Sequence, residues 1–138
     1  MISIVGIGSG ASAIARCFAE VDNYDIYCLN DGVEKNTKSD FMLPSCKTPE
    51  ECEENIPNLK KFFSKIRDRV QVFIIGSTLS SNYTLGILEQ IRDKQIEVFY
   101  IQPDTEMLTG MGSLNQRATF GVLQEYARSG LFKSITLI

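Results

Sequence analysis

The sequence contains no histidine among its 138 residues. Histidine is the side chain that most readily exchanges a proton near neutral pH, and it is a common zinc ligand. Its absence excludes His-based acid–base catalysis and most zinc sites. We therefore assign no catalytic residue and no metal-ligating residue to this chain.

Cysteine is sparse and lacks the spacing of a metal or redox motif. The four cysteines are Cys17, Cys28, Cys46 and Cys52, with no CxxC pair among them. Cys17 and Cys28 fall on apolar faces of a predicted helix and a predicted strand, which favours buried free thiols in a reducing compartment. We infer no disulfide and expect a cytoplasmic protein.

Clusters of basic residues and long apolar runs are also missing. The chain has 14 Lys and Arg against 17 Asp and Glu, a net charge of -3, and the basic residues are scattered. This balance argues against binding to a nucleic-acid backbone. No apolar stretch approaches the roughly 18 residues that span a bilayer, and the N-terminus lacks the basic region of a signal peptide. Neither nucleic acid nor membrane is an expected partner.

What is present is the composition of a globular protein. Hydrophobic residues make up 43% of the chain and charged residues 22%, with no low-complexity segment. The length lies near the commonest size of one domain. We expect residues 1–138 to form a single domain.

Short β-branched runs alternate with segments whose apolar residues recur at helical spacing. Strands are predicted at residues 2–7, 24–29, 70–76, 96–101 and 132–138. Helices are predicted to begin at Ala11 and Pro49 and to span Tyr83 to Lys94 and Leu114 to Ser129. The alternation predicts an α/β fold with a Rossmann-like, doubly wound parallel sheet of about five strands.

The second helix has a distinct start signal. Thr48, Pro49 and Glu51 match a capping box with proline at the first helical position. Pro57 predicts a break, after which the apolar spacing predicts that the helix continues to Ile66. The residues before Thr48 are predicted to form a long polar loop.

A glycine-rich turn between the first strand and the first helix matches the pattern G-x-G-x-x-A over residues 6–11. Glycine allows the backbone to approach a phosphate, and the amides at the start of a helix stabilise its negative charge. The alternative is a tight turn that binds nothing. The residues assigned to phosphate binding are Gly6, Gly8, Ser9, Gly10 and Ser12.

Two polar residues end the second strand about twenty residues after the glycine turn. A dinucleotide-binding fold places an acidic side chain there on a ribose hydroxyl. Asn30 and Asp31 are therefore candidate ligands of a ribose. The alternative is that Asn-Asp-Gly simply forms a turn.

A second polar loop follows the strand at 70–76, at the same edge of the predicted sheet. Its hydroxyls and amides are candidates for a second phosphate, with ordinary helix capping as the alternative. Asn115 and Arg117 are candidates for contact with a phosphate or a base, or else are solvated. The candidates in the second loop are Gly76, Ser77, Thr78, Ser80, Ser81 and Asn82.

The order of these motifs resembles the N-terminal, nucleotide-binding half of the tubulin/FtsZ family of GTP-dependent filament proteins. Gly6 to Ser12 resembles the first phosphate loop, and Asn30-Asp31 resembles the Asn-Thr-Asp turn after the second strand. Thr48-Pro49-Glu50 is similar to the segment before the third helix, and Val72 to Gly76 to the strand that enters the signature loop. The segment from Pro103 to Ile138 resembles the end of that domain.

The resemblance implies binding of GTP or GDP, with Mg²⁺, and assembly into a homo-oligomer or onto a related filament protein. The family's glycine-rich signature is replaced here by Gly76-Ser77-Thr78-Leu79-Ser80-Ser81-Asn82. The family's hydrolytic acids come from a second, C-terminal domain, which we expect to be absent. At most a weak GTPase is therefore expected.

Two rival functions fit the same residues. An NAD(P)-binding Rossmann domain is supported by the G-x-G-x-x-A match and by Asp31. An adaptor that keeps the fold without a ligand is supported by the loss of glycine from the second loop. The three functions differ in the ligand that each predicts.

Overall fold

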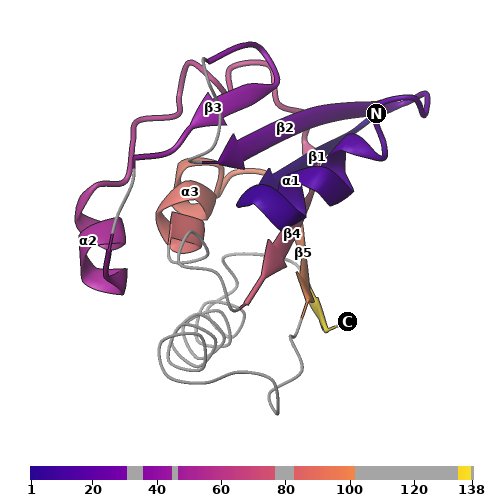
Figure 1. Cartoon of the computed structure of the whole chain (residues 1–138). Helices are drawn as coiled ribbons and strands as arrows, with labels where there is room; N and C mark the ends of the chain where they lie inside the picture. The colour runs from indigo at the N-terminus through magenta and orange to yellow at the C-terminus, as the bar shows by residue number, and fades with distance from the viewer. Residues whose placement is uncertain (31–35, 45–46, 77–82, 102–133, 138) are drawn as a thin grey trace.

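Six parallel strands form one sheet in the order β3-β2-β1-β4-β5-β6 (Figure 1). The computed structural model describes residues 1–30, 36–44, 47–76, 83–101 and 134–137. The strands are β1 (Ile2–Ile7), β2 (Tyr24–Asn30), β3 (Asp40–Met42), β4 (Arg69–Ile75), β5 (Gln95–Ile101) and β6 (Ser134–Leu137). The helices are α1 (Ser9–Arg16), α2 (Pro49–Glu54) and α3 (Thr84–Gln90).

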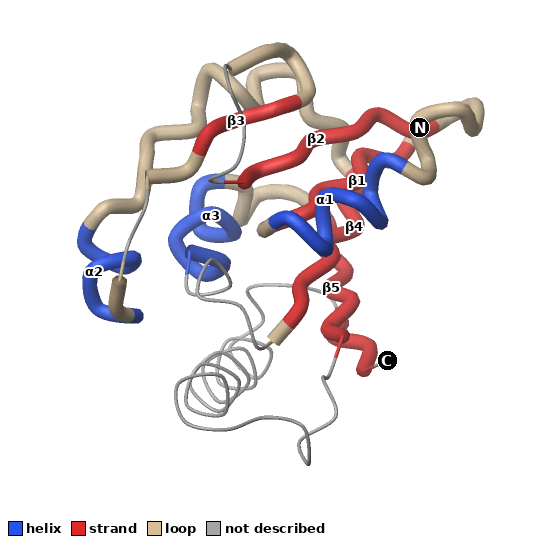
Figure 2. The backbone as a smooth tube through the Cα atoms, in the orientation of Figure 1, coloured by secondary structure: helices blue, strands red, loops and turns tan. Residues whose placement is uncertain are grey.

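This architecture confirms the predicted α/β fold and its Rossmann-like parallel sheet, with one strand more than expected. The chain builds the sheet outward from β1 to β3, then returns to the centre and builds outward again from β4 to β6 (Figure 2). The order of the strands therefore reverses between β1 and β4. In sheets of this type, ligands bind at the carboxyl ends of the strands beside such a reversal.

The sheet separates two hydrophobic clusters. On one face Ala15 of α1 packs against Ile4 and Cys28. On the other face Ile87 and Leu88 of α3 pack with alternate residues of the central strands, among them Val5, Leu29, Val72 and Val98. Since side chains alternate between the faces of a strand, α1 and α3 cover opposite sides.

Strand β3 lies within the segment predicted to be a polar loop, so that prediction is wrong for residues 40–42. Hydrogen bonds to β2 on one edge and to Asn36 on the other hold the strand in place. Cys28 donates its N–H to Ser39 O at 2.7 Å, and Leu43 donates to Asn30 O at 3.0 Å. Met42 donates to the side-chain oxygen of Asn36 at 2.8 Å. A side chain thus satisfies an N–H that an edge strand would otherwise leave open.

The predicted helix through Ile66 is also wrong, because α2 ends at Glu54 and residues 60–65 form hydrogen-bonded turns. A distant side chain bonds the backbone of the segment that follows α2. Gln90 of α3 accepts the N–H of Leu59 at 2.6 Å and donates to Pro57 O at 2.8 Å. These bonds replace the backbone pairing that a continuous helix would need.

The start of α2 is confirmed. Thr48 accepts the N–H of Glu51 at 3.1 Å, and Pro49 occupies the first helical position. The Glu51 carboxylate accepts from Lys47 N at 3.3 Å, one residue before the cap. The predicted helix at 114–129 lies outside the described residues.

The cysteines differ from the expectation in two ways. Cys28 is buried as expected, but Cys17 is exposed. Cys52 is disulfide-bonded, which corrects the inference that no disulfide forms. Since disulfides are typical of oxidising compartments, Cys52 gives no support to the expected cytoplasmic location.

The two free thiols found in the described residues, Cys17 and Cys28, should react at very different rates with an aromatic disulfide reagent. Burial raises the pKa of Cys28 and its Sγ donates to Ser12 O at 3.7 Å, so its thiol should react only when the protein opens. We expect Cys17 to react more than about a thousandfold faster. Cys17→Ser should remove one equivalent of thiol from the rapid phase of the absorbance change. Cys28→Ser should leave the rapid phase intact. Rapid reaction lost in Cys28→Ser instead would contradict the packing of α1 on β2.

Candidate functional site

The glycine turn predicted from the sequence lies between β1 and α1, beside the reversal of strand order. Gly8 caps the helix with φ 96° and ψ 168°, in the region that L side chains rarely adopt. Its N–H donates to Leu29 O at 2.7 Å, which joins the turn to β2. Gly8 is therefore required for the shape of the turn, and its own N–H is already bonded.

Gly6 allows α1 to pack closely on β1. A Cβ at position 6 would lie 2.6 Å from the carbonyl oxygen of Ala11 and 2.8 Å from Cα of Ser12. Both are backbone atoms of the helix, so a side chain here would force the helix away from the strand. The first residue of the motif thus sets the position of the helix that follows it.

The start of α1 has open hydrogen-bond donors. Ser12 donates its N–H to Gly8 O at 2.9 Å, while the N–H groups of Ser9, Gly10 and Ala11 have no partner in the described part of the chain. The first turn carries no acidic side chain and no side-chain cap. The partial positive charge of a helix N-terminus is therefore not neutralised here.

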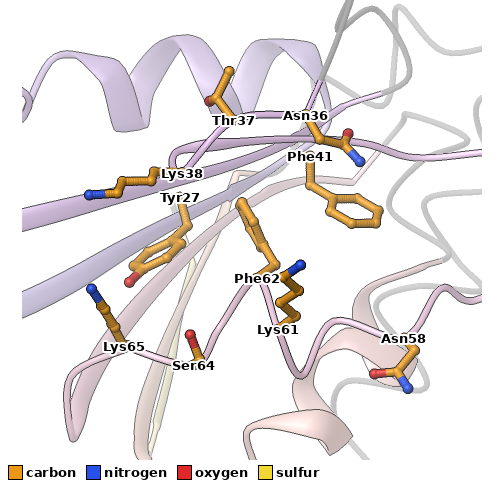
Figure 3. A pocket seen from close by; sticks show the side chains of 10 residues that line it. All are labelled: Tyr27, Asn36, Thr37, Lys38, Phe41, Asn58, Lys61, Phe62, Ser64 and Lys65. Carbon is orange, nitrogen blue, oxygen red and sulfur yellow. The ribbon is translucent and has the colours of Figure 1, made fainter.

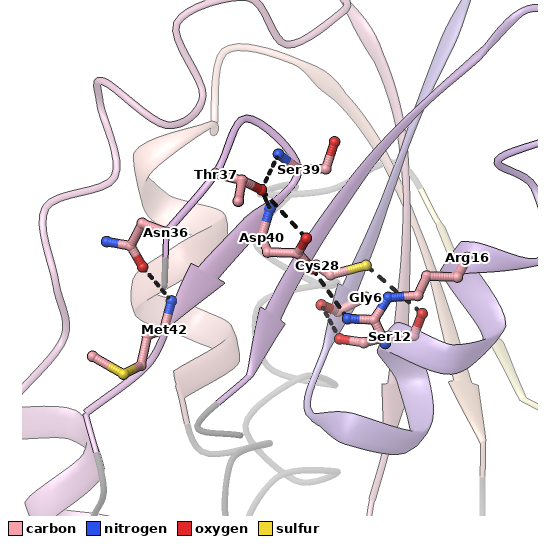
Figure 4. A network of polar contacts seen from close by, with 9 residues as sticks. All are labelled: Gly6, Ser12, Arg16, Cys28, Asn36, Thr37, Ser39, Asp40 and Met42. Atoms are coloured by element: carbon pink, nitrogen blue, oxygen red, sulfur yellow. Dashed lines mark hydrogen bonds and ion pairs between the residues drawn. The ribbon is translucent and has the colours of Figure 1, made fainter. Parts of the chain in front are cut away.

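The two serines of the turn differ in position. Ser9 is exposed at the start of the helix. Ser12 is fully buried, and its hydroxyl donates to Gly6 O at 3.4 Å (Figure 4). The hydroxyl of Ser12 thus ties the helix to the strand, and that of Ser9 is the one presented at the surface.

Among the described residues, Asn30 carries a buried side-chain oxygen that the packing leaves unsatisfied. It is 8% exposed, and its Oδ1 has no hydrogen-bond partner. Cys28, two residues earlier on β2, faces α1, so the alternation of the strand places the Asn30 side chain on the same face. The register pairs Ile7 with Leu29. Asn30 therefore lies beside the glycine turn, with an acceptor available there.

Gly76 ends β4 on the other side of the reversal, and packing explains this glycine. A Cβ at position 76 would overlap the hydroxyl of Tyr100. The Gly76 N–H donates to Ile101 O at 3.2 Å. The remaining candidates lie outside the described residues: Asp31, Ser77, Thr78, Ser80, Ser81, Asn82, Asn115 and Arg117.

An ion pair attaches β3 to the far end of α1. Arg16 contacts Asp40 at 3.0 Å, and Asp40 also accepts from the Thr37 hydroxyl at 3.3 Å (Figure 4). Half of the Arg16 side chain is exposed, so the pair contributes little to stability by itself. The pair lies on the face of the sheet that carries α1 and links that helix to β3.

No protein-family model and no curated protein matches this sequence. In the described residues no helix is long and apolar enough to cross a membrane, and no group of three or more His, Cys, Asp or Glu residues is arranged to hold a metal ion. The geometry of the β1–α1 turn is therefore the basis for inferring a function.

Replacing Gly6 tests the packing of the turn. We expect Gly6→Ala to lower the free energy of unfolding by about 3 kcal/mol, because the added methyl group meets backbone atoms. Gly10→Ala is the matched control. Its Cβ meets only the end of the Ile75 side chain at 2.5 Å, and alanine favours the helix, so a change within about 1 kcal/mol is expected. Urea denaturation measures the free energy of unfolding of both variants. An equal loss of stability in the two variants would refute the close approach at Gly6.

Replacing Asn30 tests the unsatisfied acceptor. Asn30→Leu removes a buried oxygen without a partner and keeps a similar volume, so we expect the ligand-free protein to become about 1 kcal/mol more stable. Ser12→Ala should have the opposite effect, because it leaves Gly6 O without its hydroxyl donor. Urea denaturation of both variants without added ligand gives the comparison. A less stable Asn30→Leu protein would mean that the oxygen is satisfied in solution.

Proposed function

We propose that this chain binds a nucleotide through its phosphates at the β1–α1 turn. The observation that carries the proposal is the buried, unpartnered Oδ1 of Asn30 beside the open N-terminus of α1. An unsatisfied buried acceptor costs stability, so its presence next to unused donors indicates a ligand that supplies hydrogen bonds. The reversal of strand order at β1 and β4 supports the same location.

The donors and the acceptor match different parts of a nucleotide. Phosphate oxygens only accept hydrogen bonds, and the N–H groups of Ser9, Gly10 and Ala11 donate them. A ribose hydroxyl donates, and the Oδ1 of Asn30 accepts. Gly8 gives the turn its shape, and the exposed Ser9 follows it at the start of the helix.

The proposed ligand is GTP or GDP, with Mg²⁺ on the phosphates, and this choice follows the tubulin/FtsZ resemblance. The nucleotide would control assembly of the chain with itself or with a related filament protein, with at most weak hydrolysis. The proposed location is the cytoplasm: the exposed free thiol of Cys17 fits a reducing environment, whereas the disulfide at Cys52 does not support it.

NAD(P) is the second candidate, and one observation favours it. The 3-2-1-4-5-6 order of this sheet is that of dinucleotide-binding domains, in which the end of the second strand contacts a ribose. Asn30 occupies that position. The two candidates share the β1–α1 turn and differ in the base.

Calorimetric titration with GTP, GDP, ATP and NAD(H) at matched Mg²⁺ tests the proposal. We expect binding of guanine nucleotides that Gly8→Val abolishes, because valine rarely adopts the φ of 96° at this position and would deform the turn. Asn30→Leu should weaken binding by roughly tenfold while the protein stays folded, so it separates loss of the site from loss of the fold. Selective binding of NAD(H) would establish the second candidate. No binding at millimolar ligand would leave an adaptor that keeps only the fold.

A further inference from the structure

We propose that a groove on the face of the sheet opposite α1 binds a small organic anion with a flat apolar body and a phosphate or carboxylate group. The groove has a volume of about 670 Å³ (Figure 3). Its walls are two segments far apart in the sequence, residues 36–41 leading into β3 and residues 58–65 leading toward β4. This volume lies within the range of small-molecule sites.

An aromatic surface lines the groove. Phe62 lies with its ring centroid 5.4 Å from that of Tyr27 and 5.4 Å from that of Phe41. Tyr27 is buried, while Phe41 and Phe62 are only partly covered by the core beneath them. Partly exposed aromatic rings in a hollow offer a surface on which a flat apolar group stacks.

The charged side chains that line the groove are all of one sign. Lys38, Lys61 and Lys65 line the groove, and no described lining residue carries a carboxylate. Among the described ion pairs none involves these lysines, although the chain as a whole has a net charge of -3. Three unpaired ammonium groups around an apolar surface are complementary to an anion.

Neutral donors complete the lining. Burial, and to a lesser extent the nearby Asp25 carboxylate, raises the pKa of Tyr27, so its hydroxyl stays protonated at neutral pH. In Figure 3 the tip of Tyr27 and the Lys65 side chain lie at one end of the groove and Asn58 lies at the other. The anionic group is therefore expected at the Tyr27 and Lys65 end.

The walls are held in place without a ligand. Gln90 bonds the backbone of Pro57 and Leu59, which anchors the segment that carries Lys61 and Phe62. Asn36 bonds Met42 N at 2.8 Å, which anchors the opposite wall to β3. A pocket with preformed walls favours a compact ligand, because ordering costs little on binding. We therefore assign a small molecule and not an acidic peptide.

The groove is separate from the glycine turn. Tyr27 belongs to the hydrophobic cluster of the α3 face, and α1 packs on the opposite face. The proposal is therefore independent of nucleotide binding at the turn. No motif in the sequence indicates the groove, because its lysines come from segments that meet only in the fold.

NMR titration of the full chain with 1-naphthyl phosphate tests the proposal. Two partial ligands are titrated for comparison: 1-naphthol, which lacks the phosphate, and inorganic phosphate, which lacks the aromatic body. We expect saturable shifts at Tyr27, Phe41 and Phe62, with binding weaker by about tenfold or more for either partial ligand. Lys61→Gln and Lys65→Gln should each weaken binding by roughly fivefold. Lys60→Gln is the matched control, because Lys60 is an exposed neighbour outside the groove and should leave the affinity unchanged.

Three results would overturn the proposal. The first is the absence of binding at millimolar 1-naphthyl phosphate. This result would overturn the proposal even if an acidic peptide bound to the groove. The second is an equal loss of affinity in Lys60→Gln, which would indicate general charge attraction. The third is a set of shifts confined to Ser9, Gly10 and Ala11, which would place the anion at the α1 turn. The lysines are exposed, so retained amide spectra of the variants show that folding is not the cause.

Discussion

The contact between the backbone of α1 and the backbone of β1 at Gly6 is the constraint on which the candidate nucleotide site depends. Because Gly6 has no side chain, the carbonyl oxygen of Ala11 can lie only 2.6 Å from the position that a Cβ would take. The hydroxyl of Ser12 then reaches Gly6 O, and Cys28 reaches Ser12 O. One missing methyl group thus brings the helix N-terminus next to the end of β2, where Asn30 lies.

The parts of the fold that were predictable from the sequence are those with local signals. The apolar run of β1 and the glycines after it indicate a strand, a turn and a helix without reference to the rest of the chain. The capping box at Thr48 is equally local: the structure confirms the Thr48 cap, while the Glu51 carboxylate accepts from Lys47 N instead of Thr48 N. Repetition of such units then favours a parallel sheet, because only a parallel sheet accommodates them in series.

The parts that were not predictable depend on distant partners. β3 has three residues, too few for a periodic pattern, and Asn36 and the pairing with β2 hold it in place. The segment after Pro57 has helical spacing, but Gln90, more than thirty positions away, bonds its backbone instead. At the site, the sequence indicated Asn30 as a candidate ligand, but only the packing shows that its oxygen is buried and unpaired.

Strand β3 contributes to both faces of the sheet. Asp40 points to the α1 face and pairs with Arg16, while the next residue, Phe41, points to the other face and lines the lysine groove. Only three residues pair it with β2, the shortest register in the sheet, so any local opening of the sheet is expected to begin at β3. A molecule bound against Phe41 would oppose that opening and keep Asp40 on Arg16. A contact that stabilises the attached strand on one face would, by linkage, also favour its attachment on the other face. β3 would then connect two surfaces that lie on opposite sides of the sheet.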